Sequence, residues 1–195
     1  VIGDAIEDCK KLAEKLDAPV CSGYQHNDSF PGSHPLAVGP LGYNGSKAAM
    51  ELISKADVVL ALGTRLNPFS TLPGYGIDYW PKKAKVIQVD MNPDRIGLTK
   101  KVTVGICGDA KQVSQQLLSK LSSSAGNNGR DERKNLIHKT KSAWLQTLTS
   151  LDHEDDDPGT VWNKEARERD KNRMSPRQAW RAIQVAMPDD VIISS

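Results

Sequence analysis

The stretch Asp57-Val58-Val59-Leu60-Ala61-Leu62-Gly63-Thr64-Arg65 decides the fold class of this chain. Its apolar part is continuous rather than alternating, which is typical of a strand covered on both faces, as in a parallel sheet. A glycine directly after such a strand lets the backbone turn sharply or approach a ligand closely. The sequence therefore predicts a buried parallel strand over 57–62 that ends in a polar turn.

Further strands and helices alternate on both sides of this stretch. The helix predicted over 110–121 has Asp109 as its N-cap and Gln112 three residues later, which is a capping-box pattern. This alternation predicts an α/β fold with a doubly wound, Rossmann-like parallel sheet over residues 1–121. A Gly- and Pro-rich loop from about residue 23 to Asn44 is long enough to be functional. The predicted strands are 19–22, 57–62, 85–90 and 102–107, and the predicted helices are 2–16, 45–55 and 110–121.

The remainder of the chain predicts a linker and two further helices, the second of which leads into an apolar run. Residues 122–173 contain a Ser/Gly/Asn-rich linker, a helix over about 131–148 and an acidic break over 152–159. Residues 174–195 begin with Ser175-Pro176, a strong helix start, and stop as an apolar run begins. The chain also starts inside a helical pattern without Met, so we expect a piece of a longer protein.

Composition excludes several classes of partner. Twenty-six basic residues face 24 acidic ones and aromatic residues make up 5%, which predicts no nucleic-acid partner. No apolar run approaches the roughly 20 residues that span a bilayer, and no secretory signal is present, so we expect no membrane partner. The cysteines, Cys9, Cys21 and Cys107, are odd in number and widely spaced, which favours reduced thiols in a cytoplasmic protein.

Polar residues follow each predicted strand, where ligands bind in open α/β sheets. Gly63 and Arg65 follow one strand, Asp90 ends the next, and Gly108-Asp109 follows the last. Ahead of helix 45–55, free N–H groups of residues 41–46 could hold an anion. Together these loops indicate an adenine-dinucleotide-like ligand. Each also has a plainer interpretation: tight turns for the glycines, a helix cap for Asp109 and a surface position for Arg65.

Two other kinds of site are poorly supported. Residues 39–47 do not form a phosphate loop, because the order is Gly45-Ser46-Lys47 and no strand immediately precedes them. No histidine has a partner at metal-ligand spacing on a helix, so we expect no metal site. No Ser-His-Asp or Cys-His arrangement is suggested by local context, so we expect no catalytic residue in the chain. His26 and His34 lie in the long loop and remain candidates to face a substrate.

Several stretches resemble the middle domain of acetolactate-synthase-type enzymes, which depend on thiamine diphosphate. These are Ser33-His34-Pro35-Leu36, residues 39–46, residues 56–65, Val89-Asp90-Met91-Asn92-Pro93 and Cys107-Gly108-Asp109-Ala110. Residues 69–80, 152–159 and 174–180 are similar to the sulfoacetaldehyde acetyltransferase family, and that likeness covers essentially the whole chain. The alternatives are an acetolactate-synthase-like or oxalyl-CoA-decarboxylase-like enzyme, or a free-standing FAD- or nucleotide-binding module.

The resemblance implies an acyltransferase that converts sulfoacetaldehyde and phosphate into acetyl phosphate and sulfite. It implies that residues 122–173 connect the middle domain to residues 174–195, the truncated start of a carboxy-terminal diphosphate-binding domain. It also implies that thiamine diphosphate, Mg²⁺ and the catalytic residues belong to parts of the protein outside this chain, which would be inactive alone. The parent would be a homo-oligomer, commonly a tetramer. Flavin-containing relatives bind FAD in this domain, but Asn67-Pro68-Phe69 replaces their charged residues, so FAD, an ADP-like ligand or no ligand all stay open. The implied cofactor-binding residues are Gly42, Tyr43, Asn44, Gly63, Arg65, Asp90, Gly108 and Asp109.

Overall fold

A computed structural model describes residues 3–150 and 176–188 of the chain. The chain divides into two compact units, Val1–Trp144 and Leu145–Ser195, and each is considered by itself. The predicted acidic break and the predicted final strand lie outside the described residues. No helix of the described part is both long and apolar enough to cross a membrane.

The first unit contains parallel strands, as predicted. Strands β3 (Val58–Leu62), β4 (Lys85–Asp90) and β5 (Val104–Cys107) form a sheet in the order β3-β4-β5, with every pair parallel. Strands β1 (Val20–Ser22) and β2 (Ala37–Pro40) form a separate parallel pair. The predicted α/β class with parallel strands is confirmed, although the strands belong to two sheets rather than one continuous sheet.

Strand β2 lies inside the region that the sequence predicted as a loop. Its sequence, Ala37-Val38-Gly39-Pro40, contains two residue types that are depleted in strands, so local propensity gave no signal. Pairing with β1 holds it instead: Cys21 lies opposite Gly39 and Ser22 opposite Pro40. Tertiary pairing therefore overrides a weak local preference here.

The helices follow the predicted ones with shifted ends. The helix expected over 45–55 begins later, because Ser46 is the N-cap whose side chain accepts a hydrogen bond from the Ala49 N–H. The α-helices of the first unit are α1 (Ile6–Leu16), α2 (Lys47–Ile53), α3 (Ala110–Lys120) and α4 (Arg130–Ser150), the last reaching into the second unit. Short 3₁₀ turns occur at η1 (Asn27–Ser29), η2 (Pro68–Ser70) and η3 (Pro93–Arg95).

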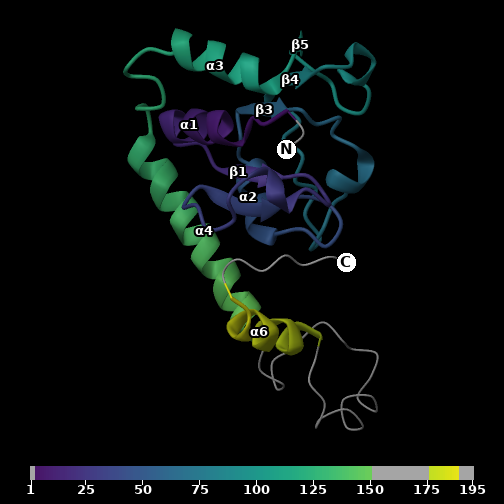
Figure 1. The fold of residues 1–195 in the computed structure, drawn as a ribbon, viewed down its shortest axis with the longest axis vertical. Helices are drawn as coiled ribbons and strands as arrows, with labels where there is room; N and C mark the ends of the chain where they lie inside the picture. Colours follow the sequence, from purple (N-terminus) through teal and green to yellow (C-terminus); the bar gives the residue numbers. More distant parts are fainter. Residues whose placement is uncertain (1–2, 151–175, 189–195) are drawn as a thin grey trace. The chain divides into compact units, whose positions relative to one another are not determined.

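Helices α1 and α3 lie side by side beside the strands of the first unit (Figure 1). Their facing surfaces are joined by Cys9 Sγ and Ser114 Oγ at 3.8 Å and by Gln115 Nε2 donating to Asp8 Oδ1 at 3.3 Å. One apolar core joins β1, β2, α2 and the first part of α4, and it includes Met50, Tyr79 and Ile137. A smaller core lies on β3 and β4 around Ala61 and Val86.

The junction between α1 and α4 is held by one guanidinium group. Arg133 donates to the carbonyls of Leu16 at 3.0 Å and Asp17 at 2.9 Å, and also to that of Gly126. Carbonyls at the end of a helix have no partner within the helix, so Arg133 satisfies those of α1. The side chain of Asp17 also pairs with Arg130.

In the second unit, the structure describes helix α6 (Pro176–Ala186). Pro176 stands at its first position, as the predicted helix start required, whereas Ser175 lies outside the described residues. Trp180 and Ile183 of this helix are 54% and 39% exposed.

Candidate functional site

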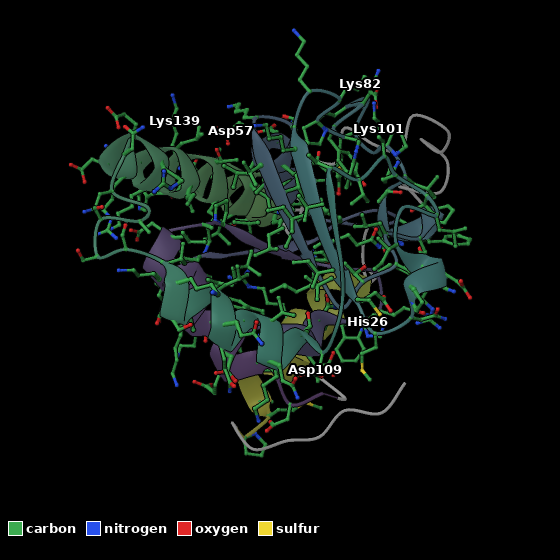
Figure 2. The ribbon with its side chains drawn as sticks, turned by 90° about the horizontal axis from the view of Figure 1, so that it is seen from above. His26, Asp57, Lys82, Lys101, Asp109 and Lys139 are labelled. Carbon is green, nitrogen blue, oxygen red and sulfur yellow. The ribbon has the colours of Figure 1, made fainter. Side chains whose placement is uncertain are left out.

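The carboxyl ends of β3, β4 and β5 meet at one edge of their sheet. The N–H groups of Gly63 and Gly108 both donate to carbonyl groups of β4, at 2.9 and 3.1 Å, so the turns after the outer strands are fastened to the central strand. Figure 2 places Asp109 at the end of the sheet opposite Asp57, which precedes β3. The structure therefore brings Gly63, Asp90, Gly108 and Asp109 to the edge where ligands bind in open α/β sheets.

Both carboxylates at this edge already accept local hydrogen bonds. Asp90 is only 6% exposed, and its Oδ1 accepts from the Asn92 N–H at 2.9 Å, which closes the turn after β4. Asp109 Oδ1 accepts from the Gln112 N–H at 3.0 Å and caps α3. The plainer interpretation of Asp109 as a helix cap is confirmed.

A second group of predicted residues, Gly42, Tyr43 and Asn44, lies in the turn over residues 41–46. The expectation that the N–H groups of this turn are all free to hold an anion is wrong. Four of them donate to carbonyl oxygens at 2.7–2.9 Å, because the turn is folded tightly against its neighbours. The pairs are Leu41 to Ser22, Tyr43 to Phe69, Gly45 to Gly42, and Ser46 to Pro40.

The backbone at Gly42 is in close contact with the loop after β3. Gly42 is buried with φ +84°, and a Cβ at this position would lie 1.8 Å from the Phe69 carbonyl oxygen. Only glycine fits, both for its positive φ and for the approach of the two backbones. Beneath the turn, burial raises the pKa of the Tyr79 phenol to about 12, a rise that the neighbouring Gly42 backbone partly offsets.

Three aromatic rings gather beside this turn. The Tyr24 ring stacks on Phe69, with centroids 6.2 Å apart, and meets Tyr43 edge-on at 6.1 Å. Tyr43 and Phe69 are 54% and 58% exposed, so the cluster presents flat apolar surface to solvent. Sequence reasoning missed Tyr24 and Phe69, because their contact joins two loops that are distant in sequence. Such rings can stack with a planar ligand.

Arg65 lies in the loop that joins the two groups of predicted residues. This loop runs from Gly63 to η2, whose Phe69 carbonyl contacts the 41–46 turn. The Arg65 side chain is exposed, while its carbonyl accepts a hydrogen bond from Thr99 Oγ1 at 3.2 Å. An exposed guanidinium is able to bind a phosphate with two parallel hydrogen bonds. Asn44 is likewise exposed, in a left-handed conformation with φ 52°.

The two loop histidines differ in their surroundings. His34 Nε2 donates to Glu14 Oε1 at 3.0 Å, its Nδ1 accepts from the Leu36 N–H at 3.1 Å, and its ring packs on Phe30. These contacts fasten the long loop to α1, which accounts for His34 without a substrate. The side chain of His26 is exposed, and it lies toward the same end of the view as Asp109 in Figure 2.

Residues 3–150 and 176–188 contain His, Cys, Asp and Glu side chains, the kinds that bind metal ions. Within these ranges, no three His, Cys, Asp or Glu side chains come together in a way that could hold a metal ion. The described residues therefore do not fit a metal-bound diphosphate cofactor.

These observations define a class: an α/β domain whose parallel strands end in glycine turns and acidic residues at a single edge. A family model described as "Thiamine pyrophosphate enzyme, central domain" matches residues 1–117. The chain belongs to this family.

Relatives match over the whole chain. A probable sulfoacetaldehyde acetyltransferase of Rhizobium meliloti (strain 1021) is 75% identical over 195 residues, which is 100% of this chain and 33% of the relative. A sulfoacetaldehyde acetyltransferase of Roseovarius nubinhibens is 70% identical over the same 195 residues, 32% of its length. A probable acetolactate synthase large subunit of Methanocaldococcus jannaschii is 34% identical over 151 residues, 77% of this chain and 23% of the relative. The chain thus spans about a third of the length of the acetyltransferases.

Proposed function

We propose that the protein to which this chain belongs is a thiamine-diphosphate-dependent acyltransferase that converts sulfoacetaldehyde and phosphate into acetyl phosphate and sulfite. The observation that carries this proposal is the difference between two groups of relatives. Five proteins named sulfoacetaldehyde acetyltransferase or probable sulfoacetaldehyde acetyltransferase match the whole chain at 47–75% identity, whereas a probable acetolactate synthase matches 151 residues at 34%. The reaction breaks a carbon–sulfur bond and joins the acetyl group to a phosphate oxygen.

In this proposal the chain supports the reaction and does not carry it out. Thiamine diphosphate would supply the chemistry at the reacting carbon and Mg²⁺ would hold its diphosphate, both in other domains of the protein. We further propose a homo-oligomer, with a tetramer as the expected state, that works in the cytoplasm. In the structure, Cys9, Cys21 and Cys107 are free thiols. Their free state supports a reducing compartment.

For the central domain itself, we propose that the two groups of predicted residues face an ADP-like ligand rather than a flavin. Arg65 would bind its phosphate, and the rings of Tyr43 and Phe69 would contact its base. The loop after Arg65 supports this choice, since Asn67 caps η2 and Phe69 is exposed where charged side chains stand in flavin-binding relatives. Arg65→Ala should weaken ADP binding, measured by titration calorimetry, and unchanged affinity would exclude this site.

The substrate assignment is tested with the whole protein, thiamine diphosphate and Mg²⁺. Two mixtures are tested in parallel, one containing sulfoacetaldehyde and phosphate and the other containing pyruvate alone. Sulfite, acetyl phosphate and acetolactate are measured in both. We expect sulfite and acetyl phosphate from the first mixture and no acetolactate from the second. Formation of acetolactate without sulfite would leave the family assignment unchanged but would show that sulfoacetaldehyde is not the substrate.

A further inference from the structure

An open groove lies at the amino end of β3 and β4, away from the site described above. Trp80 and Tyr79 form part of its lining, together with residues 54–56 and 81–84. Three of its lining residues are lysines, Lys55, Lys82 and Lys83, and one is acidic, Asp78. In Figure 2, Lys82 lies at the same end of the sheet as Asp57 and opposite Asp109.

A fourth lysine reaches the groove from the segment before β5. Lys100 Nζ lies 5.0 Å from the centre of the Trp80 ring, where a cation is attracted by the face of the indole. Its charge also helps to lower the pKa of the Asp78 carboxyl, after the larger effect of Lys82. Lys100 therefore belongs to the same electrostatic environment as the groove, although it is distant from it in sequence.

The positive charge of this groove is not balanced locally. Asp78 pairs with Lys82, whose Nζ lies 2.8 Å from Oδ2. Among the described residues, no carboxylate lies within ion-pair distance of Lys55 or Lys83. The whole chain has a net charge of only +2, so four lysines against the single carboxylate of Asp78, an excess of three positive charges, are a local concentration of charge. Grooves lined by one sign of charge concentrate ions of the opposite sign.

We propose that this groove binds a compact oxyanion with two or more negative charges, the phosphate end of a small molecule being the class that fits. Lysine ammonium groups bind phosphate as point charges on flexible stems; three of them line this groove, and a fourth, that of Lys100, lies over the ring of Trp80. Nucleic acid is disfavoured, because affinity for it requires neutralisation of many phosphates along an extended surface. The proposal does not depend on the proposed acyltransferase activity.

The test follows the indole N–H signal of Trp80 by NMR, assigned through its loss in Trp80→Phe, while inorganic pyrophosphate is added to the 195-residue chain. We expect a saturable shift of this signal. The double variant Lys83→Gln, Lys100→Gln should weaken binding about tenfold or more, since each lost ammonium removes a charge-assisted contact. Lys139→Gln is the matched control, because Lys139 is exposed on α4 and labelled in Figure 2 away from the groove.

A second variant should change the affinity for pyrophosphate in the opposite direction. Asp78→Asn removes the one carboxylate that lines the groove among the residues the structure describes, and it releases Lys82, so pyrophosphate should bind a few-fold more tightly. No Trp80 shift at millimolar pyrophosphate, or equal weakening by Lys139→Gln, would overturn the proposal. A Trp80 shift with a poly-glutamate peptide but not with pyrophosphate would also overturn it and indicate an acidic polypeptide as the partner.

Discussion

The turn at Gly42 and the lysine groove both adjoin Tyr79, and different forces define them. At the turn, two backbones touch so closely that a single Cβ would lie 1.8 Å from a carbonyl oxygen. At the groove, the lysine side chains are flexible and open to water, and Lys82 is 79% exposed. Close packing of two backbones therefore fixes the shape of the turn, whereas the charge of the lysine side chains determines which ions the groove can bind. Substitutions should therefore change stability at the first and ion binding at the second.

The largest effect should come from Gly42→Ala. The added Cβ meets the Phe69 carbonyl and forces a positive φ on alanine, so the free energy of unfolding should fall by at least about 3 kcal/mol in urea denaturation. Gly76→Ala is the matched control: its φ is also positive, at +71°, but a Cβ there meets nothing within 4 Å. It should cost only about 1 kcal/mol. Equal losses in both variants would show that the close approach at Gly42 has no energetic weight.

Tyr79 links the two regions and should make the protein sensitive to alkaline pH. Burial raises its pKa from 10.0 to about 12, so the folded state holds the phenolic proton more tightly than the unfolded state. This contribution is fully present below pH 10 and is lost as pH rises toward 12, a fall of about 2–3 kcal/mol. Denaturation at several pH values should reveal this slope, and Tyr79→Phe should flatten it. An unchanged slope in Tyr79→Phe would assign the alkaline loss to other groups.

A smaller effect is expected at the carboxyl end of the sheet. Asp109→Ala removes the acceptor for the Gln112 N–H at the start of α3, which should cost about 1 kcal/mol of stability. Asp109→Asn keeps a capping oxygen and should lose much less. Thermal unfolding of both variants separates the two expectations. A loss as large in the asparagine variant would point to the negative charge rather than the cap.

The smallest effect on stability belongs to the groove. Lys82→Gln breaks an ion pair whose two side chains are 79% and 61% exposed, and water screens such pairs strongly. The melting temperature should therefore stay unchanged within error, at both low and high salt. A clear drop in melting temperature would mean that the lysines of the groove stabilise the fold. The groove would then resemble the turn in its effect on stability.

The parts of the fold that could be predicted from sequence are those with local signals. The continuous apolar run at 57–62 identified β3, and the spacing of Asp109 and Gln112 identified the start of α3. Strand β2 was missed, because Gly39 and Pro40 carry no strand preference and only pairing with β1 makes the segment extended. The division into two sheets was missed for the same reason, since pairing partners are not written in local periodicity.

The candidate site shows the same limit. Gly63, Asp90 and Gly108 could be expected at one edge, because the carboxyl ends of parallel strands meet there. The contact of Tyr24 with Phe69 could not be predicted, because it joins segments far apart in sequence. The approach of Lys100 to Trp80 at the groove could not be predicted for the same reason. The N–H groups of the 41–46 turn looked free from sequence, since the carbonyls that bind them are supplied by the folded structure.

The most direct test of the proposed role is to assay this chain and the whole protein side by side. Each is mixed with thiamine diphosphate, Mg²⁺, sulfoacetaldehyde and phosphate, and sulfite and acetyl phosphate are measured over time. We expect equal amounts of both products from the whole protein, none when phosphate is omitted, and no turnover by the 195-residue chain alone. Sulfite release by the chain alone, or its absence from the whole protein, would contradict the assignment of this chain as a supporting central domain of a sulfoacetaldehyde-cleaving acyltransferase.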